Sequence, residues 1–249
     1  MRLLAQSLGV LGILFIVTGY LTQLPVKNSK PVAGGPDSKC TLPPDGFPGG
    51  FKGPVIALEF AGSVCDIEGI LGGDSHQNRK DIRSALGFDT YFIIAYWLFF
   101  VMMGVVSTQR GLQWTTWIGV AAILGGTSAA IFDFIENSRI RKVLDTPLAQ
   151  TTGEMALSIR EATLLKWGVI FITVALFAAT FFFLRDVGSR VQHWIALLTG
   201  ISFAAAALLG FVGLRYNRLI PLTTLIQLPG LLGLIILSFK WPEAFLDKL

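Results

Sequence analysis

The chain has 249 residues, of which 53% are hydrophobic and only 14% carry a charge. Soluble domains carry about 25% charged residues, so this composition excludes an ordinary soluble protein and indicates a membrane protein. The net charge of +4 comes from scattered Lys and Arg residues, without the basic stripe and interleaved aromatic residues of a nucleic-acid-binding surface. We therefore expect membrane lipids around the chain and no nucleic acid among its partners.

Six apolar segments are long enough to cross a membrane, because about 20 largely apolar residues in a helix span roughly 30 Å of hydrocarbon. They lie approximately at residues 3–22, 90–107, 113–135, 164–184, 191–214 and 219–239. The first segment follows Arg2 as in a signal peptide, but no small-x-small cleavage site comes after it, so we interpret it as a retained helix. The pattern predicts an all-α fold, a single polytopic transmembrane domain at residues 1–249 that forms a bundle of about six helices.

The extramembrane loop at residues 23–89 has two parts. Its first part, 27–53, is rich in Gly and Pro and does not form a regular helix. Apolar residues then recur at helical spacing, which predicts an amphipathic surface helix at 55–71, too short and too polar to span the membrane. Cys40 and Cys65 both fall in this loop. They either form a disulfide, if the loop faces an oxidising compartment, or remain two separate thiols.

Polar residues follow the third predicted span without a break, since residues 129–142 read AAIFDFIENSRIRK. A stripe of small residues at four-residue spacing begins at Ala122, and such a stripe lets another helix approach closely. At about 100° per residue, Asp133 lies about 20° from this stripe. Glu136 lies about 40° to one side of it and Asn137 about 60° to the other, by the same geometry. These three side chains are therefore expected to point into the bundle.

The alternating direction of the spans brings polar residues from other helices to the same membrane face. Asp89 precedes the second span, Glu161 and Lys166 lie at the start of the fourth, and Arg215 ends the fifth. We predict one polar cluster beneath that face, formed by Asp89, Asp133, Glu136, Asn137, Glu161, Lys166 and Arg215. The predicted surface helix, with Glu59, would lie over this cluster.

The predicted cluster has two interpretations. Ionisable residues within a membrane are costly to bury and commonly mark function. Pairs such as Asp133–Lys166 or Glu136–Arg215 could instead simply lock the helices together. A hard cation bound by Asp133, Glu136 and Asn137 is chemically possible, but Lys166 and Arg215 would compete for the same carboxylates. We expect no metal and no cofactor, while a bound lipid is compatible with the bundle.

The stretch FDFIEN, together with FDTYFIIAYWLFF and LLKWGVIF at two helix starts, resembles a family of uncharacterised bacterial multi-pass membrane proteins. The stretch VIALEFA fits the same resemblance, which covers roughly residues 54–184. Its most specific part is the D-x-x-E-N motif at the end of a transmembrane helix, here Asp133, Glu136 and Asn137. The resemblance implies a location in the bacterial inner membrane and brings no activity with it.

Three functions are compatible with these features. The sequence contains no nucleophile elbow, P-loop or dinucleotide fingerprint, which favours a non-enzymatic subunit or partner-binding scaffold of a membrane complex. The alternative is a membrane enzyme acting on a lipid-like substrate, with Asp133 or Glu136 as the acid-base group and Lys166 or Arg215 as its charge partner. A small-solute or proton-coupled transporter is the second alternative, and the apolar character of the other half of each helix, apart from Gln227 and scattered hydroxyls, argues against it.

Overall fold

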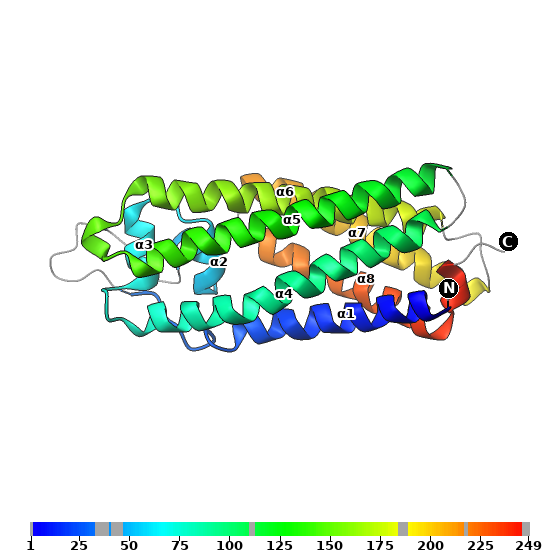
Figure 1. Cartoon of the computed structure of the whole chain (residues 1–249), viewed down its shortest axis with the longest axis horizontal. Coiled ribbons are helices and arrows are strands. Elements are labelled where there is room, and N and C mark those ends of the chain that lie inside the picture. The colour runs from blue at the N-terminus through cyan, green and yellow to red at the C-terminus, as the bar shows by residue number, and fades with distance from the viewer. Residues whose placement is uncertain are drawn as a thin grey trace. The chain divides into compact units, whose positions relative to one another are not determined.

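The computed structural model describes residues 2–32, 40, 47–109, 113–183, 189–216 and 219–245. Within these ranges the ordered elements are helices, apart from an isolated β-bridge between Phe47 and Phe51. This confirms the all-α prediction (Figure 1). The Gly- and Pro-rich stretch predicted at 27–53 falls partly outside the described residues, because they exclude 33–39 and 41–46.

Six helices of the described chain are long and apolar enough to cross a membrane, as expected for a polytopic membrane protein. They are α1 (Arg2–Gln23), α4 (Gln77–Thr108), α5 (Gln113–Asp145), α6 (Gly153–Phe183), α7 (Arg190–Arg215) and α8 (Ile220–Lys240). Three of them are longer than the predicted spans: α4 begins at Gln77 instead of 90, α5 ends at Asp145 instead of 135, and α6 begins at Gly153 instead of 164. A hydropathy pattern marks only the apolar part of a helix. These three helices continue beyond that part through one or more polar turns, so the predicted spans are shorter than the helices.

The chain forms two compact units. Unit 1 comprises Met1–Val17, Ile94–Ala130 and Trp167–Leu249. Unit 2 comprises Thr18–Ile93 and Ile131–Lys166.

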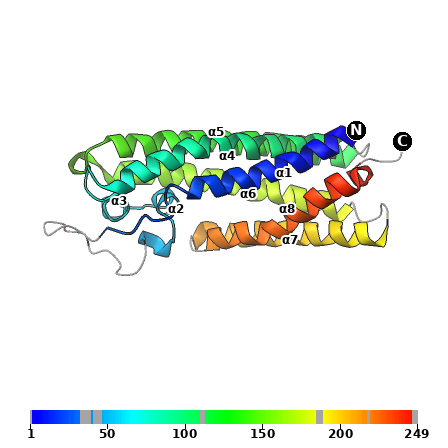
Figure 2. The same cartoon turned by 90° about the horizontal axis from the view of Figure 1, so that it is seen from below.

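In unit 1, α7 and α8 lie side by side (Figure 2). Pro229 lies inside α8, where a proline ring clashes with the carbonyl one turn earlier and interrupts the helical hydrogen bonds. The Ser202 hydroxyl of α7 provides hydrogen bonds to the backbone groups at this interruption. It donates to the carbonyl of Ile226 and accepts a 3.1 Å hydrogen bond from the backbone N–H of Gly230. The proline therefore creates a polar contact that fixes α8 against α7.

In unit 2, two short helices replace the single surface helix predicted at 55–71, so that prediction is wrong. They are α2 (Pro54–Glu59) and α3 (Val64–Leu71). Ser63 breaks the predicted helix, because its hydroxyl caps α3 by accepting a hydrogen bond from the backbone N–H of Asp66. The apolar side of α3, including Ile67 and Ile70, is fully buried in the protein and so does not rest on a membrane surface.

The first turn of α4 anchors α3 in unit 2. The side-chain amide of Asn78 donates to the carbonyl of Ile70 at 2.7 Å and to that of Lys30 at 2.9 Å. These bonds hold the end of α3 beside the start of α4 (Figure 1). We call Pro54–Arg79, which contains α2, α3 and the first residues of α4, the cap of unit 2.

Candidate functional site

The centre of the site is the ammonium group of Lys166 on α6, which lies among three carboxylates of unit 2. Its Nζ lies 2.8 Å from Oε2 of Glu136 and 3.2 Å from Oδ1 of Asp133, both on α5. It also lies 3.4 Å from Oε2 of Glu59 at the end of α2. One lysine therefore connects a helix of the cap with two of the long helices. We call these four residues the Lys166 cluster.

Most of the Lys166 cluster is inaccessible. Lys166 is 4% exposed, Asp133 4% and Glu136 1%, while the side chain of Glu59 is 12% exposed. Charged groups at such positions require paired partners, because removing an ion from water costs several kcal/mol even after relaxation. The three carboxylates supply these partners, so the short distances are a condition for burying Lys166 at all.

Asp89 and Asn137 form a second contact between α4 and α5. The side-chain amide of Asn137 donates to Oδ2 of Asp89 at 2.6 Å, and Asn137 is buried whereas Asp89 is half-buried. The motif at the end of the predicted third span thus contacts α6 through Asp133 and Glu136 and α4 through Asn137.

Two residues assigned to the predicted cluster lie elsewhere. Glu161 is exposed on α6, because five residues place it about 140° around the helix from Lys166. Arg215 belongs to unit 1 and is exposed, with its guanidinium carbon 6.0 Å from the centroid of the Tyr216 ring. The cation that pairs with Glu136 is Lys166, where the sequence also suggested Arg215.

The two cysteines of the loop are joined. Cys40 and Cys65 form a disulfide across 25 residues of sequence, and Cys65 lies in the first turn of α3. The sequence left open whether these thiols pair. The cross-link ties α3 of the cap to the loop that precedes α2.

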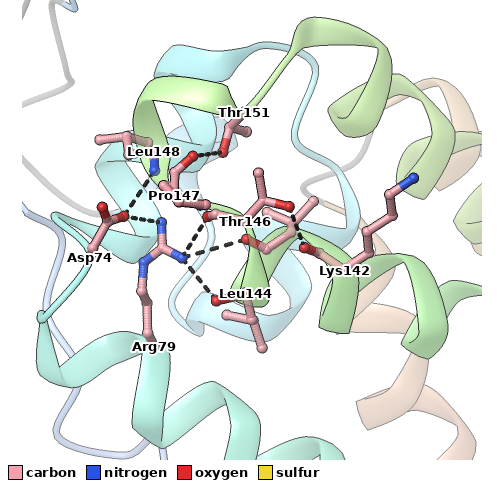
Figure 3. Close-up of polar contacts among 9 residues, drawn as sticks. Asp74, Arg79, Lys142, Leu144, Thr146, Pro147, Leu148 and Thr151 are labelled. Carbon is pink, nitrogen blue, oxygen red and sulfur yellow. Dashed lines mark hydrogen bonds and ion pairs between the residues drawn. The ribbon is translucent and has the colours of Figure 1, made fainter.

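Arg79, a residue outside the predicted cluster, is buried in unit 2 at the start of α4. Its Nη1 donates to the carbonyls of Leu144 and Thr146 at 3.0 and 3.2 Å, and its Nη2 lies 3.3 Å from Oδ1 of Asp74 (Figure 3). The same Asp74 oxygen accepts a 2.8 Å hydrogen bond from the backbone N–H of Leu148. Arg79 thus satisfies the last carbonyls of α5, a role that basic residues commonly take within one helix. Here the arginine lies 65 residues away in sequence, so local patterns carry no signal for it.

A shallow groove lies on the outer side of α5 in unit 2. Its volume is about 440 Å³, and it is lined by Ile131, Phe134, Ile135, Ser138 and Arg139. None of these residues belongs to the Lys166 cluster, although they alternate with its acids along the same helix. The opposite faces of one segment of α5 therefore carry the buried charges and the open groove.

The chemistry of the Lys166 cluster is that of an ion-pair network. Within the described residues, no group of three or more His, Cys, Asp or Glu side chains is arranged to hold a metal ion. The ammonium of Lys166 occupies the place among the carboxylates that a cation would take. The arrangement connects α2, α5 and α6 through one ammonium group.

Comparisons with known proteins add neither a family nor an activity. No family model matches the chain, and no curated protein or solved structure matches it.

Proposed function

We propose that the protein is a non-enzymatic integral membrane protein, a subunit or scaffold whose cap receives a protein partner, in the bacterial inner membrane. The observation that carries this proposal is the Lys166 cluster, in which one buried ammonium connects Glu59 of the cap with Asp133 and Glu136 of α5. Such a connection fixes the cap on the long helices before any partner binds.

Accessibility supports a locking role over a catalytic one. A general acid or base must come within hydrogen-bond reach of its substrate. Asp133, Glu136 and Lys166 are each 4% exposed or less, and the groove on α5 is lined by other side chains. The three residues that could act as acid, base or charge partner are therefore the ones that are least accessible to a substrate.

The stability of the cap supports the second half of the proposal. α2 has six residues and α3 has eight, and isolated helices this short are not stable in water. Three connections hold them in place: the Glu59–Lys166 ion pair, the Cys40–Cys65 disulfide and the hydrogen bond from Asn78 to Ile70. Arg79 joins the remainder of the cap, the start of α4, to the end of α5. A surface ordered in advance loses less conformational entropy when a partner binds.

The test is native mass spectrometry of the tagged protein, extracted gently from its own membrane. We expect a stoichiometric protein partner with wild-type protein and a reduced share of the complex with Glu59→Gln, which frees the cap from Lys166. Glu161→Gln makes the same acid-to-amide change at an exposed position of α6, so this control should retain the partner.

The opposite result is equally clear. A partnerless protein in every gentle extraction would contradict the scaffold proposal, as would complexes that Glu59→Gln and Glu161→Gln retain equally. Circular dichroism of both variants verifies that the long helices remain folded. Loss of the complex can then be assigned to the cap.

Acid-base chemistry on a lipid-like substrate is the second candidate, and one observation favours it. Oε1 of Glu136 is buried and has no hydrogen-bond partner within the described residues, an expensive state that a substrate hydroxyl would relieve. In this case Glu136→Gln changes the lipid profile of the membrane while the protein stays folded. An unchanged lipid profile in that variant eliminates this candidate.

A further inference from the structure

The residues that line the groove on α5 change from apolar to polar along the helix. Ile131, Phe134 and Ile135 are exposed apolar residues at one end, and Ser138 and Arg139 line the other. Exposed apolar side chains on a helix of this length and hydropathy face lipid chains. The change to polar residues therefore marks where the hydrocarbon ends.

A second cation extends the polar end of the groove. At about 100° per residue, Lys142 lies about 20° from Ile131 around α5 and Ser138 lies about 20° to the other side. Lys142 is exposed and makes no ion pair within the described residues. Its side chain extends away from the contacts that Arg79 makes with the end of α5 (Figure 3).

Arg139 is fixed in a position that leaves donors available. Its Nη1 donates to the carbonyl of Ser158 on α6, which holds the guanidinium at the side of the groove. A guanidinium has five N–H donors, so several remain for an oxyanion. Arginine donors of this kind match phosphate in geometry and charge.

The lengths agree with the headgroup end of a single lipid. The rise of about 1.5 Å per residue gives the apolar strip from Ile131 to Ile135 a length of about 6 Å, enough for the first part of an acyl chain, and extends the polar end from Ser138 to Lys142 by about another 6 Å. We propose that this groove binds an anionic phospholipid, with an acyl chain against Ile131, Phe134 and Ile135 and the phosphate group at Ser138, Arg139 and Lys142. This site is separate from the partner-binding role of the cap and stands without it.

The charge of the polar end selects the occupant. A purely apolar groove would accept a helix or any lipid chain equally well. Two cations and a hydroxyl beside an apolar strip instead fit a negative headgroup above an acyl chain, and each Lys or Arg near a membrane surface contributes about a fivefold preference for anionic lipid. The occupant is therefore a phospholipid with a net negative charge.

The experiment uses full-length protein in phosphatidylcholine nanodiscs that contain a small fraction of phosphatidylglycerol with a photoreactive acyl chain. We expect crosslinks on the peptide that contains Ile131–Lys142, found by mass spectrometry. Unlabelled phosphatidylglycerol should compete with the probe, whereas extra phosphatidylcholine or inorganic phosphate should not. Lys142→Gln should lower the labelling about fivefold.

Lys80→Gln is the matched control. Lys80 is exposed in the first turn of α4, whose neighbour Arg79 reaches the carbonyl of Leu144, so it lies at the same level of unit 2 as Lys142. This variant should keep wild-type labelling. Arg139→Gln is a second test, but it also removes the hydrogen bond to Ser158. Lys142→Gln is therefore the decisive variant, because it removes a charge without removing an ion pair between described residues.

Three results would overturn the proposal. Equal labelling by photoreactive phosphatidylcholine and phosphatidylglycerol would mean ordinary lipid contact. Competition by inorganic phosphate alone would mean a free-anion site. Crosslinks between two copies of α5, with no lipid adduct, would mean that the groove is an interface between protein molecules.

Discussion

Nζ of Lys166 lies 2.8 Å from Oε2 of Glu136, and both residues are almost fully buried. The pair is a direct connection between α6 and α5, and Glu59 extends it to α2. Lys166 therefore holds α5, α6 and the α2 helix of the cap together at one position. The first two predictions follow from this connection.

Lys166→Met should destabilise the protein strongly. The change leaves the carboxylates of Asp133 and Glu136 buried without their cation, and removal of one partner of a buried pair costs about 3–5 kcal/mol. The free energy of unfolding in detergent, measured by denaturant titration, gives the value. Lys80→Gln, at an exposed position, should change it little, and equal stability of the two variants would contradict the locking role.

Glu59→Gln should loosen α2 selectively. The 3.4 Å ion pair with Lys166 is lost, while Asp133 and Glu136 still neutralise the ammonium. Hydrogen–deuterium exchange should therefore increase across Pro54–Glu59 and remain unchanged in α7 and α8. If exchange in α2 stays at the wild-type rate, the ion pair does not hold the cap.

The Cys40→Ser/Cys65→Ser double variant should destabilise the cap. Cross-linking a loop of this length, 25 residues, stabilises a protein by about 3.5 kcal/mol in the chain-entropy estimate. Proteolysis should then cut between residues 40 and 65 faster than in wild-type protein. Alkylation of the unreduced wild-type protein followed by mass measurement is the control, since the disulfide leaves neither cysteine to react.

Arg79→Leu should fray the end of α5. The substitution removes the donor to the carbonyls of Leu144 and Thr146, and a buried acceptor left without a partner costs about 1–3 kcal/mol. Backbone exchange at residues 143–148 reports the effect. Arg83→Gln is the comparison, because Arg83 pairs with Asp145 at the exposed surface, where a pair contributes only about 0–1 kcal/mol. Equal fraying in both variants would show that charge alone is responsible.

Much of the fold was predictable because membrane spans carry a strong hydropathy signal. The angular position of Asp133 and Glu136 on α5 was predictable as well, since helical geometry is regular enough to extrapolate over 14 residues. The break between α2 and α3 was missed although Ser63 and Asp66 form an S-x-x-D pattern that is typical of a helix start. The apolar spacing across 55–71 outweighed that local signal.

The remaining parts of the site had no local signal. Glu161 was assigned by its level along α6, but its angle around that helix points it outward. Arg79 acts on the far end of another helix, a contact that depends on how the chain packs and that no spacing encodes. The choice of Lys166 over Arg215 as the partner of Glu136 is likewise a result of packing.

The most direct test of the central claim is a double-mutant cycle on Lys166 and Glu136, read as free energies of unfolding in detergent. The variants are Lys166→Met, Glu136→Gln and their combination. We predict strong coupling: each single variant is destabilised, and the double variant loses clearly less than the sum of the two. The reason is that Glu136→Gln removes one of the two carboxylates, Asp133 and Glu136, that Lys166→Met leaves buried without a cation. Additive effects, or single variants as stable as wild-type protein, would contradict the claim that this pair locks α5 to α6.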